Sequence, residues 1–237
     1  MYKGIYIALS GATLKQTQVD IISQNLANAS TLGYKKDKVA FQEYLLSQMN
    51  GQQNPNEERT LSDLATVKTD FSTGNIVRTG NPLDVAVDGT GFISLEDGKY
   101  TRRGDLKLSN DGYIVTQQGT RVLGKNGPIR ISGQGTIDIN PSGDVSLDGL
   151  QIDRIKVVDF PDMNALRKSG EDTFETQQIP VVSKATVKQG YVETSNIEVV
   201  RELVQLIAAM REFEMAQKAV QSFDDATAKV TNDMARM

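Results

Sequence analysis

The residue types that carry most enzyme chemistry are missing from this chain. Its 237 residues include no His and no Cys. The commonest general base, the commonest metal ligand and every thiolate mechanism are therefore excluded, and no disulfide can form. The remaining candidates for chemistry are a glycine and lysine loop and a set of carboxylates.

One segment, Gly119 to Lys125, matches the glycines and lysine of a phosphate-binding loop. A working loop of this type needs a Ser or Thr after the lysine to hold Mg²⁺, followed directly by a helix. Asn126 replaces that hydroxyl residue, and Gly127-Pro128 prevents a helix from starting there. We interpret the segment as a short strand between two turns, and the sequence predicts no cofactor.

Aspartates in the middle of the chain are numerous enough for a two-carboxylate glycosidase. They are Asp84, Asp88, Asp105, Asp111, Asp138 and Asp144. Most stand beside Gly or in turn clusters, where Asp is favoured because it bonds the local backbone. Asp84 and Asp88 also begin like a calcium loop, but Ala86 and Leu95 occupy ligand positions. The sequence therefore predicts no catalytic residue and no metal site.

Charge and hydropathy narrow the range of partners. The chain has 26 basic and 30 acidic residues, a net charge of -4, so it lacks the basic field that nucleic acid requires. The group Lys35, Lys36 and Lys38 is interpreted as solvated surface. No apolar run approaches the roughly 18 residues of a transmembrane segment. The N-terminus lacks the apolar core of a cleaved signal peptide, so any export is expected to proceed without one.

Both ends of the chain carry apolar residues at the spacing of three and four that predicts one face of a helix. The stripes consist of Ile5, Leu9, Val19, Ile22 and Leu26 in the first segment, and of Leu203, Leu206, Met210, Phe213 and Val220 in the last. Gly33 is expected to end the first helix. Ser195 and Glu198 form a capping-box pattern that predicts the start of the last one. A helix of about 40 residues, or about 60 Å, needs partners, so we expect the ends to pair with each other and with copies of the chain.

The segment between the ends has a different composition. Of the 20 glycines, 14 fall between Gly74 and Gly149, among short alternating apolar runs, and this pattern is typical of an all-β domain. We therefore predict an α+β fold in which long N- and C-terminal helices form a coiled-coil-like module with an inserted all-β domain. The expected boundaries are residues 1–48 and 192–237 for the helical polymerisation module, 49–80 and 174–191 for extended linkers, and 81–173 for the β domain.

Four blocks of sequence carry a resemblance to a known family. They are Asn25 to Lys36, Thr79 to Phe92, Tyr100 to Gly104 and Val192 to Asn196. In this order they resemble the bacterial flagellar basal-body rod proteins of the rod and hook axial family. The first block holds the motif residues Asn25, Leu26, Ala27, Asn28, Thr31, Gly33 and Tyr34. Gly124 to Ile129 and Arg211 to Met215 are most similar to the FlgF type of proximal rod protein, and next to the FlgG type of distal rod protein.

The resemblance implies a structural subunit rather than an enzyme. Such a subunit would be exported by the flagellar apparatus and polymerise with copies of itself and other rod proteins into a torque-transmitting tube in the periplasm, with no small-molecule substrate. Phe41 and Leu45 match a candidate export element, although core packing explains them equally well. Two alternatives stay open: a secreted carbohydrate-binding or hydrolytic β domain on a coiled-coil oligomerisation module, and a cytoplasmic coiled-coil adaptor.

Overall fold

The computed structural model describes residues 2–41, 65–170 and 172–234, which fold into two compact units. The helical unit comprises Met1–Ala27, Asp37–Lys68 and Glu198–Met237, and the β unit comprises Asn28–Lys36 and Thr69–Ile197. Two long terminal helices and a β-rich region confirm the predicted α+β class. None of the described helices is both long enough and apolar enough to span a membrane.

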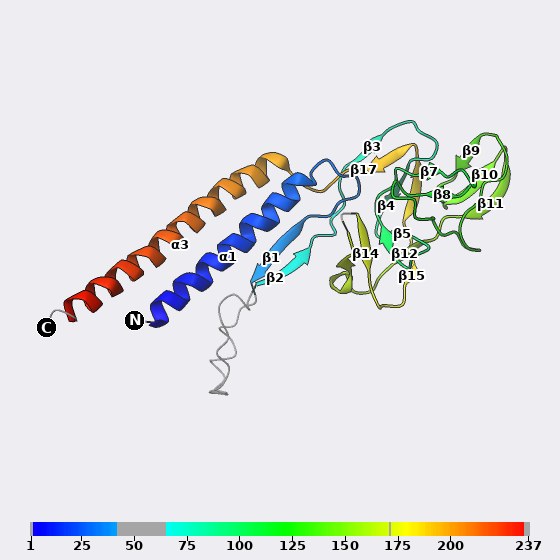
Figure 1. Cartoon of the computed structure of the whole chain (residues 1–237). Helices are drawn as coiled ribbons and strands as arrows, with labels where there is room; N and C mark the ends of the chain where they lie inside the picture. The colour runs from blue at the N-terminus through cyan, green and yellow to red at the C-terminus, as the bar shows by residue number, and fades with distance from the viewer. Residues whose placement is uncertain (1, 42–64, 171, 235–237) are drawn as a thin grey trace. The chain divides into compact units, whose positions relative to one another are not determined.

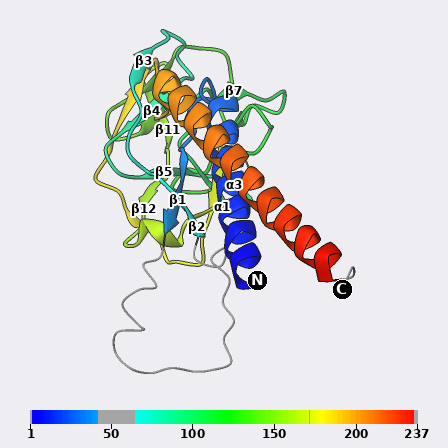
Figure 2. The same ribbon diagram turned by 90° about the vertical axis from the view of Figure 1, so that its left-hand side faces the viewer.

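The helical unit is built on two helices, α1 (Tyr2–Ala27) and α3 (Val199–Met234). They run side by side in opposite directions (Figure 1), and Figure 2 shows the start of α1 and the end of α3 at the same end of the pair. The 36 residues of α3 contain neither Gly nor Pro, and at 1.5 Å per residue they extend about 54 Å. Strands β1 (Asp37–Phe41) and β2 (Ala65–Thr69) form a two-stranded sheet, and β1 packs against α1.

The β unit consists of short antiparallel strands in several small sheets. The largest sheet has six strands in the order β13-β14-β6-β5-β12-β15. The elements are β3 (Ile76–Arg78), β4 (Val85–Asp88), β5 (Phe92–Ser94), β6 (Tyr100–Thr101), β7 (Lys107–Leu108), β8 (Ile114–Val115), β9 (Ile137–Ile139), β10 (Asp144–Leu147), β11 (Leu150–Arg154), β12 (Val157–Asp159), the 3-10 helix η2 (Met163–Ala165), β13 (Arg167–Lys168), β14 (Thr173–Glu175), β15 (Val181–Val182), β16 (Thr186–Gln189) and β17 (Tyr191–Glu193).

Two apolar clusters form the core of the β unit. The larger one is aliphatic and includes Val85, Ile114, Val122 and Ile129, all of which are fully buried. The smaller one is aromatic, with Phe92 and Phe174 at its centre and ring centroids 5.4 Å apart in an edge-to-face arrangement. Edge-to-face contacts of this kind add to the free energy gained from area burial alone. The β unit therefore has a core of its own.

The segments expected to be extended linkers contain strands. Strand β16 pairs with β4, with Val187 opposite Val87, and β17 pairs with β3 in the register Val192 opposite Val77. Val187 and Val192 are both buried, because alternation along an extended chain turns every second side chain inward. Residues 42–64, which include the first half of the first expected linker, lie outside the described residues.

Both predicted helix boundaries are wrong in detail. Helix α3 begins at Val199, and the buried Oγ of Ser195 has no hydrogen-bond partner within the described chain, so the predicted capping box does not form. Instead the Glu198 carbonyl accepts the first helical bond, from the Glu202 amide at 3.0 Å. Helix α1 ends at Ala27, which leaves Gly33 in a later turn rather than at the helix terminus.

Candidate assembly site

The surface between α1 and α3 is the first feature of a site for assembly. Buried or half-buried residues recur on α3 in alternating steps of four and three: Glu202, Leu206, Ala209, Phe213, Ala216 and Val220. This spacing keeps one stripe of a helix facing a partner helix. On α1 the buried residues include Ala12 and Ile22, and a Lys15–Glu212 ion pair joins the two helices.

Only part of the predicted stripe is buried within the chain. Ile22 is buried, and Val19, Leu26, Leu206, Phe213 and Val220 are half-buried. Leu9, Leu203 and Met210 remain 52%, 41% and 48% exposed. The side chain of Ile5 lies outside the described residues, although its backbone belongs to α1. Ala209, only 1% exposed, occupies the inward position that the sequence pattern assigns to Met210, because Ala209 continues the four-three spacing from Glu202 and Leu206.

A second apolar surface of α3 is exposed. We define the α3 ridge as Val200, Leu203, Val204, Ile207 and Met210, which are between 41% and 77% exposed. At about 100° per residue these five side chains form a stripe distinct from the one that contacts α1. Contiguous exposed apolar surface of this kind marks an interaction site. Of the five ridge residues, only Leu203 and Met210 belong to the helical stripe predicted from the sequence.

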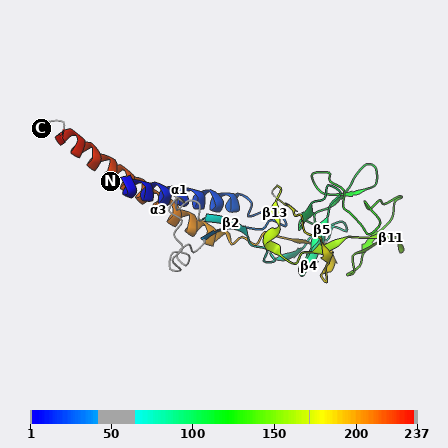
Figure 3. The ribbon, with the colours of Figure 1, turned by 90° about the horizontal axis from the view of Figure 1, so that it is seen from below.

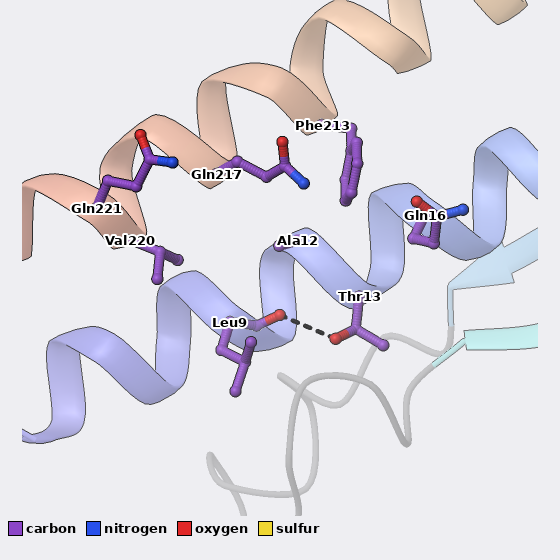
Figure 4. Close-up of a pocket in the computed structure, with 8 residues that line it drawn as sticks. All are labelled: Leu9, Ala12, Thr13, Gln16, Phe213, Gln217, Val220 and Gln221. Atoms are coloured by element: carbon purple, nitrogen blue, oxygen red, sulfur yellow. Dashed lines mark hydrogen bonds between the residues drawn. The ribbon is translucent and has the colours of Figure 1, made fainter. Parts of the chain in front are cut away.

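A groove opens farther along the same helix pair. We define the α1/α3 groove by Leu9, Ala12, Phe213 and Val220, with Thr13, Gln16, Gln217 and Gln221 completing its lining (Figure 4). Its volume is about 470 Å³. The Thr13 hydroxyl donates a hydrogen bond to the Leu9 carbonyl at 3.0 Å and is thereby satisfied within α1. The groove has an apolar floor and a rim of uncharged amides, which suits an aliphatic partner.

The family motif residues direct the chain away from α1. In the helical unit, Asn25 is buried, donates to the Asp37 carbonyl at 2.8 Å and accepts from the Asp37 amide at 2.9 Å, so it pairs with β1 as a strand would. Leu26 and Ala27 complete α1. In the β unit, Asn28 and Thr31 form a turn, in which the Thr31 amide donates to the Asn28 carbonyl at 3.1 Å.

Gly33 and Tyr34 lie deep in the β unit. Gly33 has a φ of +69°, and a Cβ built there would lie 2.4 Å from the Arg103 backbone nitrogen. Its amide donates to the Glu193 carbonyl at 2.8 Å. Tyr34 is 1% exposed and stacks beneath the Lys168 ammonium at 4.0 Å. The glycine is thus required both for its backbone conformation and for the close approach of another segment.

Next to this turn is a buried ion cluster, made by Lys35, Arg102 and Glu193. The exposed fractions of these residues are 0%, 3% and 0%. One Glu193 oxygen accepts from Lys35 Nζ at 2.5 Å and from the Gly74 amide at 2.9 Å, while the other accepts from Arg102 at 3.2 Å. Removing one partner of such a cluster leaves an unpaired charge in the interior.

The buried ion cluster joins segments that are far apart in sequence. Lys35 Nζ also donates to the Ser72 carbonyl at 2.8 Å, and Arg102 donates to the carbonyls of Val87 and Gly89. Beside it, Asn196 accepts from the Lys36 amide and donates to the Asp70 carbonyl. The chain segments that lead to and from the helical unit are therefore held together inside the β unit.

Burial sets the protonation behaviour of the two cations. Desolvation is the main effect that lowers the pKa of the Lys35 ammonium, and the neighbouring Arg102 charge adds to it, while Glu193 opposes it. Desolvation also lowers the pKa of Arg102. The interpretation of Lys35 as solvated surface was therefore wrong: the sequence gives no periodicity from which its partner, 158 residues away, could be deduced.

The remaining candidate residues serve structural roles. Asp105 accepts from Arg103 at 2.6 Å, Asp88 pairs with Lys188 at 2.6 Å, and Asp144 accepts from Arg154, whose hydrogen bond is the main cause that lowers the pKa of Asp144. No helix follows the Gly119 to Lys125 segment. Within the described parts of the chain, no group of acidic side chains could hold a metal ion. Phe41 ends β1, but its side chain and all of Leu45 lie outside the description.

Models of three protein families match this chain, each in a different segment. Residues 5–35 match the model of the flagella basal body rod protein, residues 86–147 that of the flagellar hook protein FlgE/F/G D1 domain, and residues 188–234 that of the flagellar basal body rod FlgEFG protein C-terminal region. The first and last matches cover most of α1 and α3, and the middle match falls in the β unit.

Full-length relatives agree with the family models. The chain is 30% identical to the flagellar basal-body rod protein FlgG of Caulobacter vibrioides over 248 residues, which cover 92% of this chain and 94% of that protein. It is 28% identical to FlgF of the same organism over 92% of each chain. It is 29% identical to FlgG of Borreliella burgdorferi over the whole of both chains. The similarity therefore includes both helices and the β unit.

Proposed function

This chain belongs to the family of bacterial flagellar basal-body rod proteins, and from that premise we propose that it polymerises through its terminal helices. It is of the FlgF/FlgG type, a structural subunit of the rod and not an enzyme. The observation that carries the proposal is the incomplete burial of α3. A helix of about 54 Å whose apolar residues remain half exposed needs further partners.

The expected partners are helices of neighbouring subunits, both copies of this chain and other rod proteins. The four-three spacing on α3 and the antiparallel contact with α1 support a coiled-coil arrangement. Within the β unit, the buried ion cluster holds together the segments through which the chain enters and leaves that unit.

We further propose that the subunit acts in the periplasmic part of the flagellar basal body, after export by the flagellar apparatus without a cleaved signal peptide. The absence of Cys from the sequence supports passage as an unfolded chain, because no disulfide has to be broken or formed. Phe41 and Leu45 remain the candidate export element. Substituting both with Ser and measuring the subunit outside the cytoplasm tests this assignment.

The assembly proposal is tested by the double substitution Leu206→Asp and Phe213→Asp. Both side chains are half-buried on the stripe that contacts α1. Each loss of apolar contact should cost about 2 kcal/mol or more, and a carboxylate without a partner adds to that cost. We expect no rods in electron micrographs of purified basal bodies, and no swimming.

The matched control is Gln205→Asp with Ala208→Asp, which places the same two charges on exposed positions of α3 outside both the stripe and the α3 ridge. This control should assemble as the unmodified chain does. Normal rods and swimming in the Leu206→Asp, Phe213→Asp variant would show that the helix pair is not needed for assembly.

A further inference from the structure

We propose that the α3 ridge of one subunit inserts into the α1/α3 groove of the next copy of this chain, in a parallel, head-to-tail contact. The inference rests on the proposed function, which says that the helices assemble but not which surfaces meet. It assigns one donor surface and one acceptor surface to each subunit.

The two surfaces are complementary in chemistry. The α3 ridge presents five aliphatic or thioether side chains, of which Val200 is 77% and Val204 63% exposed. The groove offers an apolar floor that includes Leu9 and Phe213, and its rim carries amides instead of charges. Seating the ridge would remove apolar surface from water on both sides without stranding a charge.

The order of residues along α3 separates the ridge from the groove. Steps of seven residues place Leu203, Met210 and Gln217 on nearly one line along the helix. Leu203 and Met210 are apolar, whereas Gln217 carries an amide and lines the groove. Figure 3 shows α1 alongside α3 over this stretch. The ridge therefore ends where the groove begins, and one subunit's ridge cannot fill its own groove.

This separation predicts how copies are placed. The ridge and the α3 wall of the groove lie ten to twelve residues apart, so two parallel copies would be displaced by about 15 to 18 Å along the helix axis. Donor and acceptor surfaces differ, so the contact is heterologous and each added copy exposes a new acceptor surface. A contact of this kind adds copies one after another and gives an open filament when the rotation between copies does not close into a ring, whereas an isologous contact ends at a dimer.

The absence of Cys allows a direct test by cross-linking in the full-length chain. A chain with Ile207→Cys and Gln217→Cys is assembled into rods under reducing conditions and then treated with a short bismaleimide. We expect a ladder of covalent multimers. Chains with either substitution alone should stay monomeric, and a mixture of the two single variants should stop at covalent dimers. Met210→Cys with Gln221→Cys has a parallel offset one residue longer, or about 1.5 Å, and should also give a ladder.

Three outcomes would overturn the proposal. Dimers from Ile207→Cys alone would mean that ridges meet each other, and a closed dimer from Leu203→Cys with Gln221→Cys would mean that copies run antiparallel. Assembled rods with no covalent species from either parallel pair would mean that other surfaces meet, while the rod function would stand. Failure of the unmodified chain to enter rods would instead contradict the proposed function. As a matched control, Gln205→Cys with Gln217→Cys should give no ladder, because the exposed Gln205 lies about 160° around the helix from Ile207.

Discussion

The two units of this protein differ in how far they bury their apolar residues. In the β unit, the core residues Val85, Ile114 and Val122 are fully buried within a single chain. In the helical unit, Val204 and Ile207 of α3 remain more than half exposed. Because burial of apolar area is the main source of folding free energy, the β unit is complete as a monomer and the helical unit is not.

This difference separates two tasks within one chain. A unit that buried all of its apolar residues internally would leave no apolar surface for contact with a neighbouring subunit. A unit that buried none of them would not be folded before it joined the rod. The β unit folds around its own core, and α3 provides exposed apolar surface for contacts with other subunits. Changes that perturb one unit and leave the other intact therefore test that division.

The largest difference is expected in amide hydrogen exchange of a dilute full-length monomer. Amides of β4 and β16 should exchange only when the β unit unfolds, which requires about 5 to 15 kcal/mol. Amides near Ile207 should open locally and exchange at least about 10³ times faster. Mass spectrometry of a sample shown to be monomeric by sedimentation gives both rates. Equal protection in the two units would contradict the division.

The next largest effect concerns the buried ion cluster. Glu193→Gln keeps the size of the side chain but leaves Lys35 and Arg102 buried without their anion. Loss of one partner from a buried cluster costs about 3 to 5 kcal/mol, so the thermal unfolding midpoint of the β unit should fall by roughly 10 °C. Glu175→Gln, an exposed position on β14, is the control and should shift the midpoint little. A similar midpoint for both variants would show that the cluster does not stabilise the unit.

The fold was predictable where the pattern is local. Spacing along α1 and α3 and the glycine turns between strands identify the class and the order of elements, because each signal depends on neighbours in sequence. Pairing between distant segments was not predictable in this way. Strand β16 pairs with β4 about a hundred residues away, and its four residues, Thr186–Gln189, form too short an alternating run to distinguish a strand from a linker.

The residues of the assembly site were also predictable only where the signal is local in sequence. Periodicity found Leu206 and Phe213, but it could not decide which apolar residues of α3 face α1 and which face outward, since both sets recur at helical spacing. Only the packing of α1 separates them. Lys35 and Glu193 stand in two sequence blocks that carry the family resemblance, yet nothing in either block indicates that the two residues meet.

A smaller effect distinguishes two roles of glycine in the β unit. Gly33→Ala would place a Cβ against the Arg103 backbone at a positive φ, whereas Gly98→Ala has a similar φ of +77° and open space around it. The backbone conformation costs about 1 to 2 kcal/mol in both variants, and overlap should add about 1 to 3 kcal/mol at Gly33 only. Urea unfolding of the two variants gives the difference. Equal losses would show that the close approach at Gly33 relaxes without cost.

The smallest effect is a pH dependence that originates in the β unit alone. The lowered pKa of Lys35 means that the folded chain releases this proton at a lower pH than the unfolded chain, whose value is near 10.5. Between the two pKa values the unfolded chain binds more protons, so the free energy of unfolding rises with pH there, by about 1.4 kcal/mol for each pH unit.

Lys35→Met removes this contribution while keeping an unbranched side chain. The difference in stability between the original chain and Lys35→Met, followed by urea unfolding as pH increases toward 10.5, should shift in favour of the original chain. Titrating groups that do not interact with Lys35 cancel in the comparison. A difference that stays flat, or that moves in favour of Lys35→Met, would mean that Glu193 outweighs desolvation at this lysine. The buried ion cluster would then have to be regarded as a source of attraction rather than as a tolerated burial of charge.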